Sequence, residues 1–166
     1  AGVEQYIYSQ IARAKEHEDK IAELHEEKKK LEKEVAGLKL KDKLSQVDSV
    51  IAAVTAFEGI NLYSGKVEVS DNEELKNLGD ELRLKMVNGV GLLVAVIDSK
   101  VGLVCTVSDS LMKEKNLSAG KIVGDIAKIL GGGGGGRPHL ATAGARDIDN
   151  IDKAIASLPE TVQKYI

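Results

Sequence analysis

Six consecutive glycines, Gly131 to Gly136, constrain the fold more than any other stretch of the sequence. A glycine in a regular element is destabilising by about 0.5–1 kcal/mol relative to alanine, because it loses the most backbone freedom on folding. Such a run is therefore either a flexible linker or a place where bare backbone closely approaches a ligand or another segment. Arg137, Pro138 and His139 follow directly, and small residues come next, whereas a linker would usually continue with serine, threonine or glycine. We therefore predict an ordered loop.

The N-terminal third of the chain is predicted to be helical, because residues 1 to about 56 hold no proline and only one late glycine, Gly37. From Ile21 on, the apolar positions alternate in spacings of three and four, as in a coiled-coil seam. Gln10, His17 and Lys28 interrupt this seam. One helix cannot bury so thin a stripe alone, so a partner helix is expected. The seam residues are Ile7, Ala14, Ile21, Leu24, Leu31, Val35 and Leu38.

A second apolar stripe follows Gly37 and consists of Leu40, Leu44, Val47, Ile51 and Val54. With Gly37 as a break, the two stripes predict a helical hairpin that pairs with another hairpin across a two-fold axis, which makes a homodimer. An arm in solvent, or one that packs on a missing part of a longer parent chain, remains the alternative.

The hydrophobic period changes after Gly59, where strands alternate with amphipathic helices. We predict a strand over 60–69 that is interrupted near Ser64-Gly65. Strands over 90–98 and 101–108 are predicted to form a hairpin with a short turn at Ser99-Lys100. Helices are predicted after Ser70 or Asp71, after Ser118 and after Asp147, and Gly131 is expected to end the second of these. The fold class is α+β or α/β, with a helical subdomain over 1–57 and a globular subdomain of mixed sheet and amphipathic helices over 58–166.

Composition limits the classes of function. The net charge of −3 argues against a broad electrostatic nucleic-acid binder, and one Phe, four Tyr and no Trp argue against binding of single strands by stacking.

The lone Cys105 cannot form an internal disulfide and is read as a buried structural thiol. With no signal peptide and no apolar run of about 20 residues in view, a cytoplasmic protein without membrane contact is expected.

The sequence contains no recognisable catalytic arrangement. No Lys-Ser or Lys-Thr follows the glycines as in a phosphate-binding Walker loop, and a helix rather than a strand precedes them, unlike a dinucleotide fingerprint. Zinc-ligand spacing and a nucleophile elbow are also absent, so no metal site is predicted. The chain is therefore expected to bind rather than to catalyse.

The glycine run is the candidate binding surface. The N–H groups of Gly132, Gly133, Gly134, Gly135 and Gly136 can reach anionic oxygens or base and ribose edges without side chains in the way. Arg137 suits phosphate and guanine edges, although it could instead form an ion pair with Asp125 or Asp147. Lys121, Lys128 and Arg146 could add phosphate contacts, and His139 is a further candidate.

The stretch GGGGGGRPHLATAG, residues 131–144, resembles the glycine-rich signature of the C-terminal, DHH-associated domain of alanyl–tRNA synthetase. The match includes Arg137 and Pro138 but departs at His139, where family members usually carry an acidic residue. The resemblance covers roughly the last two-thirds of the chain, from about Glu58. The other matching positions are Gly131, Gly132, Gly134, Gly135, Gly136, Ala141 and Gly144.

The resemblance implies that the globular part contacts the outer corner of tRNA, with alanine-specific tRNA as the expected partner, and that the helical part promotes homodimerisation. It implies upstream domains of the parent chain as further partners, which carry out aminoacylation and editing with ATP, Mg and a zinc ion. This chain alone is expected to need no cofactor and not to charge tRNA.

A related signature, GGG-x-H-x-x-A-x-G, closes phosphoesterases of the DHH type. His139 favours this alternative, in which the chain would hold a nucleotide beside a metal site of an upstream domain. The Arg-Pro pair and the long helical N-terminal segment argue against it.

Overall fold

The computed structural model describes residues 2–166 and divides into two compact units, one that extends to Lys43 and one that spans Leu44–Ile166. A single helix, α1 (Gly2–Ala52), forms the first unit and ends in the second. The division falls earlier than the predicted boundary at residue 57, because Val47 and Val50 near the end of α1 are buried in the core of the second unit.

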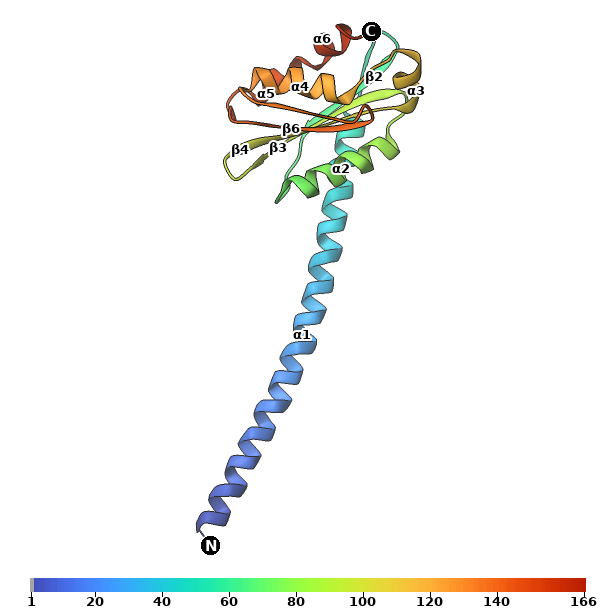
Figure 1. Ribbon diagram of the computed structural model, residues 1–166. Helices are drawn as coiled ribbons and strands as arrows, with labels where there is room; N and C mark the ends of the chain where they lie inside the picture. The colour runs from blue at the N-terminus through green and yellow to red at the C-terminus, as the bar shows by residue number, and fades with distance from the viewer. Residues whose placement is uncertain (1) are drawn as a thin grey trace. The chain divides into compact units, whose positions relative to one another are not determined.

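The predicted helical hairpin is wrong, because α1 continues through Gly37 as one helix of 51 residues (Figure 1). A glycine within a helix costs only about 1 kcal/mol relative to alanine, and no turn residue follows Gly37 to offer the backbone another path. The stripe that begins at Leu40 therefore lies on the same helix as the heptad seam. Within residues 2–52, the chain does not supply a partner helix for its own seam. None of the helices in the described range 2–166 has the length and apolar character of a membrane span.

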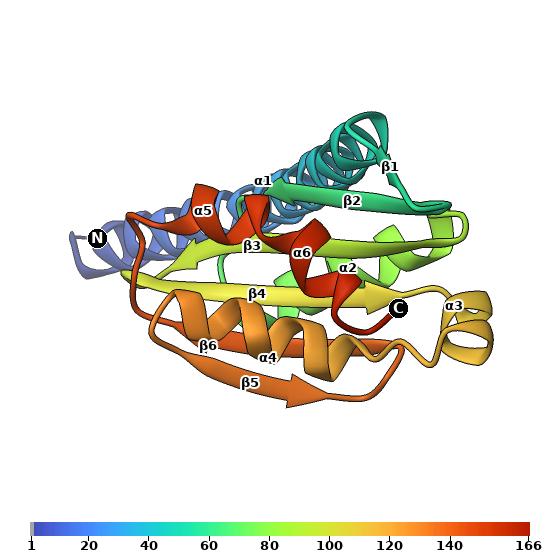
Figure 2. The same cartoon turned by 90° about the horizontal axis from the view of Figure 1, so that it is seen from above.

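The second unit is built on a six-stranded sheet (Figure 2). Strands β2 and β3 are parallel, and all the other neighbours are antiparallel. The predicted hairpin is confirmed, because β3 and β4 are joined by Asp98 and Ser99, whose positive φ angles of 48° and 62° suit a tight two-residue turn. Across the sheet, the strands are β1 (Thr55–Phe57), β2 (Ile60–Lys66), β3 (Gly89–Ile97), β4 (Lys100–Val107), β6 (Leu140–Ala145) and β5 (Gly133–Gly136).

Helices cover the two faces of the sheet unequally. On one face, α2 (Asn72–Lys85) packs with the end of α1 over a core that includes Leu93 and Val104. On the other face lie α4 (Ala119–Ile129), α5 (Ile151–Ala156) and α6 (Leu158–Gln163), which appear above the sheet in Figure 1 and in front of it in Figure 2. The mixed sheet with amphipathic helices is thus confirmed, although the last predicted helix is split into α5 and α6.

The start of α2 confirms the predicted capping signal. The Asp71 carboxylate accepts a hydrogen bond of 2.8 Å from the Glu74 amide, and the Glu74 carboxylate accepts one of 2.7 Å from the Ser70 amide. The first bond satisfies an amide that the helix itself leaves unpaired, as an N-cap does, and the second holds the residue before the cap to the first turn. Asp71 rather than Ser70 is the N-cap residue.

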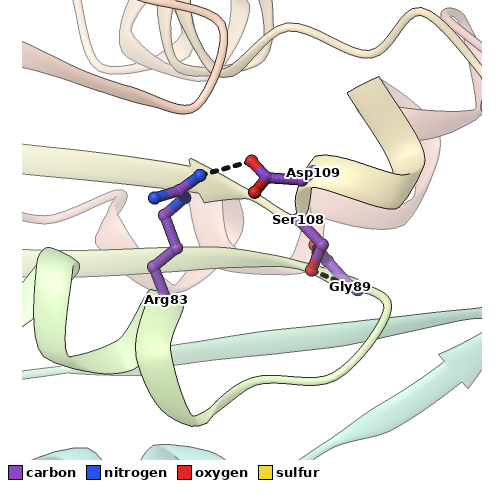
Figure 3. Close-up of polar contacts among 4 residues, drawn as sticks. All are labelled: Arg83, Gly89, Ser108 and Asp109. Carbon is purple, nitrogen blue, oxygen red and sulfur yellow. Dashed lines mark hydrogen bonds and ion pairs between the residues drawn. The ribbon is translucent and has the colours of Figure 1, made fainter. Parts of the chain in front are cut away.

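A polar cluster ties α2 to the end of the hairpin (Figure 3). The Arg83 guanidinium donates to the carboxylate of Asp109 in α3 (Asp109–Glu114), a short helix that follows β4. Beside it, the Ser108 hydroxyl accepts from the Gly89 amide at 2.9 Å and donates to the Gly89 carbonyl at 3.1 Å. Position 89 must stay bare, because a Cβ there would lie 2.3 Å from the Asn61 carbonyl oxygen.

Candidate functional site

The glycine run is ordered, as predicted, but it forms an edge strand rather than a loop. Gly133–Gly136 make up β5, which pairs antiparallel with β6 and is the outermost strand at its end of the sheet (Figure 2). The reason is that β6, rich in alanine and glycine, offers a partner strand that can approach the glycine backbone closely. We call β5, β6 and their turn the glycine ribbon, residues 132–145.

The helix before the ribbon ends as predicted at Gly131, which has a φ of +68°. The Gly131 amide donates to the Lys128 carbonyl and the Gly132 amide to the Ala127 carbonyl, at 3.1 and 2.8 Å. This pattern is the Schellman motif, in which a left-handed glycine stops a helix and satisfies its last carbonyls. It turns the chain from α4 directly into β5.

Alternate glycines of the ribbon face opposite sides of the sheet. A Cβ at Gly132, Gly134 or Gly136 would lie 2.1–2.9 Å from the backbone of β6, so these three positions cannot hold a side chain without movement of the strand. A Cβ on Gly133 or Gly135 would meet no atom within 4 Å, and neither residue has a positive φ. Packing therefore accounts for the first set of glycines and not for the second.

The buried side of the ribbon is closed by α4. A Cβ on Gly120 would lie 2.9 Å from the Gly136 carbonyl oxygen, and one on Gly124 would lie 3.3 Å from that of Gly134. The lack of a side chain at these two glycines therefore lets α4 lie close against β5. The Ala119 amide also donates to the Pro138 carbonyl at 2.9 Å, which fixes the ribbon's turn to the start of the helix.

The opposite side of the ribbon is uncovered. Gly133 pairs with Gly144, and Gly135 pairs with Thr142, and all four residues are exposed on the face where α2 lies. Here an open groove runs between the ribbon, the β3–β4 turn and the first residue of α2. The groove is lined by the glycines and small residues of 131–134 and 142–145 and by apolar residues of β3 and β4. Its charged and amide-bearing residues are Asp98, Lys100, Arg146 and Asn72.

The predicted basic residues fall into three places. Arg146 lines the groove, whereas Arg137 and His139 lie in the ribbon's turn. The Arg137 side chain is exposed and, in the described chain, forms no ion pair with Asp125 or Asp147. Asp147 instead accepts from the amides of Asp149 and Asn150. The half-buried His139 uses its carbonyl to accept from the Val107 amide at 3.1 Å.

Lys121 and Lys128 lie on α4, which covers the other face of the sheet. Lys121 lies 5.9 Å from the ring centre of Tyr165, and Lys128 lies 3.6 Å from the Asp125 carboxylate. Tyr165 donates a 2.5 Å hydrogen bond to Asp125, which lowers the pKa of the Asp125 carboxyl and raises the pKa of the Tyr165 hydroxyl. This cluster attaches the end of the chain to α4 and is separate from the groove.

The sequence did not reveal two of the groove's side chains, Lys100 and Asn72. Lys100 follows the β3–β4 turn and Asn72 begins α2, and only the tertiary fold brings them beside residues 131–146. Cys105, by contrast, is fully buried as predicted, and burial raises the pKa of its thiol. No group of three or more His, Cys, Asp or Glu side chains within 2–166 is arranged to hold a metal ion.

Comparison with known proteins gives matches over most of the chain. The family model described as DHHA1 domain matches residues 59–164. An alanine–tRNA ligase of Clostridioides difficile is 38% identical over 147 residues, which are 89% of this chain and 17% of the ligase. One from Chlorobium luteolum is 39% identical over 149 residues, which are 88% of this chain and 16% of the ligase. The chain thus spans about one sixth of the length of these relatives.

Among solved structures, the C-Ala domain of Aquifex aeolicus alanyl-tRNA synthetase is similar, with a TM-score of 0.59 and 30% identity. The alignment covers 65% of this chain and 96% of that domain. The recognition of the glycine-rich signature in the sequence is thereby confirmed.

Proposed function

Since the chain belongs to the DHHA1 domain family, as found in the C-terminal part of alanine–tRNA ligases, we propose that it is a tRNA-binding and dimerisation module of such a ligase. The observation that carries the proposal is the uncovered face of the glycine ribbon. Gly133 and Gly135 have no packing reason to lack a side chain, so contact with a ligand explains them better than the fold does.

The chemistry of the groove suits an RNA backbone. The free edge of β5 offers backbone amides that do not pair with β6 and can donate to phosphate and ribose oxygens, and a side chain on the ribbon's open face would hold the RNA away. Lys100 and Arg146 supply positive charge at the groove, which also contains Asp98, and Arg137 supplies a planar donor at the ribbon's turn. Because these cations are few and the net charge is −3, we expect weak binding that declines with salt.

Alanine-specific tRNA is the expected partner, with contact at the outer corner of the folded molecule. The module would keep tRNA close to the aminoacylation and editing sites of the parent enzyme in the cytoplasm. We assign it no catalytic step and no cofactor, because ATP, Mg and zinc would serve the upstream domains.

The α1 helix supports the second half of the proposal. Its heptad seam is uncovered within the described chain, and six of its apolar residues are each about half exposed or more. Pairing with a second copy would bury this seam, which a lone helix cannot do. The upstream domains of a longer parent chain are the other partners that we propose.

Binding of alanine-specific tRNA, a second tRNA and a single-stranded RNA at low and moderate salt tests the RNA half. We expect preference for the folded tRNAs and at least a tenfold loss of affinity in Arg137→Glu, from loss of a charge-assisted contact and gain of repulsion. Lys153→Glu, the same charge change on the exposed side of α5, is the matched control and should bind normally.

Lys100→Glu and Arg146→Glu should also weaken binding, whereas reversal of Lys121 or Lys128 should have smaller effects, because these lysines lie on the other face. Equal affinity of Arg137→Glu and the control would contradict the ribbon assignment. Binding of short oligonucleotides without preference for folded tRNA would instead support the phosphoesterase-type alternative.

A further inference from the structure

The heptad spacing of the seam continues along α1 from Val3 to Leu38, with the polar residues Gln10, His17 and Lys28 at three of its positions. Along it, positions a and d alternate in spacings of four and three, so that every seam residue lies on one side of the helix. The side chains of the seam are uncovered, with 50% of Ile7, 51% of Leu24 and 61% of Leu38 exposed. The seam comprises Val3, Ile7, Gln10, Ala14, His17, Ile21, Leu24, Lys28, Leu31, Val35 and Leu38.

We infer that two copies of the chain pair through this seam in antiparallel orientation, with the two-fold axis crossing α1 between Ala22 and Glu23. The inference rests on the dimerisation proposed above and adds its geometry. Two features of the sequence on the helix surface carry it: where the polar seam residues meet, and which charges meet beside the seam.

The first feature is the match of layers across the seam. In an antiparallel pair, a residue at position a faces one at position d of the other helix. With the axis at this place, His17 of one copy faces Lys28 of the other, so two of the three polar seam residues pair with each other. A neutral imidazole can accept a hydrogen bond from the ammonium group. Ile21 then faces Leu24. Pairing of two polar residues within an apolar seam favours this alignment of the two helices over alignments shifted along the seam.

The second feature is the charge beside the seam, at positions e and g. In an antiparallel pair, position g meets g and position e meets e. The same axis sets Lys20 against Glu27 and Arg13 against Glu34, and each contact occurs twice in the dimer. On the other side, Glu4 meets Lys39, and no like charges meet at any flanking position of residues 4–41.

Other arrangements bring like charges together. A shift by one heptad in one direction sets Lys20 against Lys20 and Glu18 against Glu18 of the other copy, and a shift in the other direction sets Glu27 against Glu27. A parallel dimer in register sets Glu27 against Glu32 and places Lys28 against Lys28 within the seam. Like charges that face each other destabilise helix pairing, so charge selects the antiparallel register.

The orientation has a consequence for the arrangement of the dimer. At 1.5 Å of rise per residue, the two copies of Lys43 would lie roughly 60 Å apart along the paired helices. In a parallel dimer they would lie side by side. An antiparallel arm would therefore place the two points at which the chains enter their globular units at opposite ends of the arm.

Reversal of the charge at Glu27 is expected to change the dimer dissociation constant in opposite directions for the antiparallel and the parallel orientation. In the antiparallel register, Glu27→Lys replaces two attractive contacts with Lys20 by two repulsive ones, and the dimer dissociation constant should rise about tenfold at low salt. In a parallel dimer the same change removes repulsion with Glu32 and should tighten pairing. Glu26→Lys, at the neighbouring outward-facing position, is the matched control.

The double variant Lys20→Glu plus Glu27→Lys should restore the dissociation constant in the antiparallel register, because the pair is only exchanged. Lys20 also contacts Glu23 of its own helix at 3.2 Å, so Glu27→Lys is the cleaner single change. Sedimentation equilibrium of the whole chain measures all these constants. Tighter pairing of Glu27→Lys would overturn the antiparallel assignment.

Cysteine pairing gives an independent readout. Ile7→Cys and Leu38→Cys variants are mixed and oxidised, one of them carrying a mass tag, and the native Cys105 stays in place because it is fully buried. The antiparallel register predicts disulfides between the two variants, whereas a parallel dimer predicts disulfides only between identical variants. The unmodified chain, oxidised in the same way, should stay uncrosslinked.

The outcomes distinguish the orientation from dimerisation itself. A dimer with disulfides only between identical variants overturns the antiparallel inference and leaves the proposed dimerisation intact. A chain that stays monomeric at every concentration in sedimentation overturns both, and points to an upstream segment of the parent chain as the partner of the seam.

Discussion

A methyl group added at Gly134 should destabilise the globular unit strongly. The new Cβ would lie 2.4 Å from Cα of Ala143 and 2.5 Å from the Thr142 carbonyl oxygen, where ordinary contacts begin at 3.4 Å. Relief requires β5 to move by about 1 Å, although α4 packs against the same residue from Gly124. Overpacking of this kind costs roughly 1–3 kcal/mol, and the obstacle here is backbone that cannot rotate away.

The neighbouring glycine provides a matched control. A Cβ on Gly133 would meet nothing within 4 Å, and the residue has no positive φ. Gly133→Ala should therefore leave stability unchanged or raise it by up to about 1 kcal/mol, because alanine lowers the entropy of the unfolded chain. Two substitutions of identical chemistry, one residue apart, thus have opposite expected signs.

Urea denaturation followed by circular dichroism measures the difference. For Gly134→Ala we expect a loss of about 2 kcal/mol, which corresponds to a midpoint lower by roughly 1 M for a slope of about 2 kcal/mol/M. Equal midpoints for the two variants would refute the alternation of glycines at which a Cβ clashes with β6 and glycines at which it meets no atom. If Gly133→Ala keeps full stability but loses tRNA affinity, the bare position serves the ligand, as we propose.

Three further predictions concern stability and assembly. Tyr165→Phe should lower the free energy of unfolding at pH 7 by about 1–2 kcal/mol through loss of the hydrogen bond to Asp125. Because the folded-state pKa of Asp125 is lowered, its contribution is present above the usual carboxyl pKa of about 3.9 and lost as the pH falls through the lower folded value. The two proteins should thus converge in acid, and a difference that persists there would argue against the ionised pair. Leu24→Asp plus Leu31→Asp should shift the mass measured by light scattering toward monomer, and an unchanged dimer would place the interface elsewhere. Asp71→Ala should cost about 0.5–2 kcal/mol in urea denaturation by removing the cap of α2, and no loss would contradict the capping role.

Local signals predicted most of the elements correctly. The β3–β4 hairpin, the cap at Ser70 or Asp71 and the stop at Gly131 each depend on a few neighbouring residues, and so they can be recognised in a sequence. The turn of the hairpin lies one residue earlier than predicted, at Asp98 and Ser99 rather than at Ser99 and Lys100. The hairpin at Gly37 was wrong for a related reason. A single glycine is a weak local signal, and the continuous helix costs too little for it to act as a break.

The candidate site was predicted in part. The glycines and the exposed Arg137 are adjacent in the sequence, so one motif contains them. Lys100 and Asn72 reach the groove from the β3–β4 turn and from the start of α2, and no local pattern connects these places. The same applies to the separation of Lys121 and Lys128 from the groove, which follows from the side of the sheet on which α4 packs.

The sequence by itself determined which family the chain belongs to, which residues alternate on the helices, and where most of the elements begin and end. Those properties depend on side-chain type and spacing within a few turns of the backbone. Only the tertiary structure decided that the glycine run is an edge strand and that its glycines divide into a set where a Cβ would clash with β6 and a set where it would meet open space. That division depends on how closely β6 and α4 approach β5, which is a distance between segments that the order of residues does not contain.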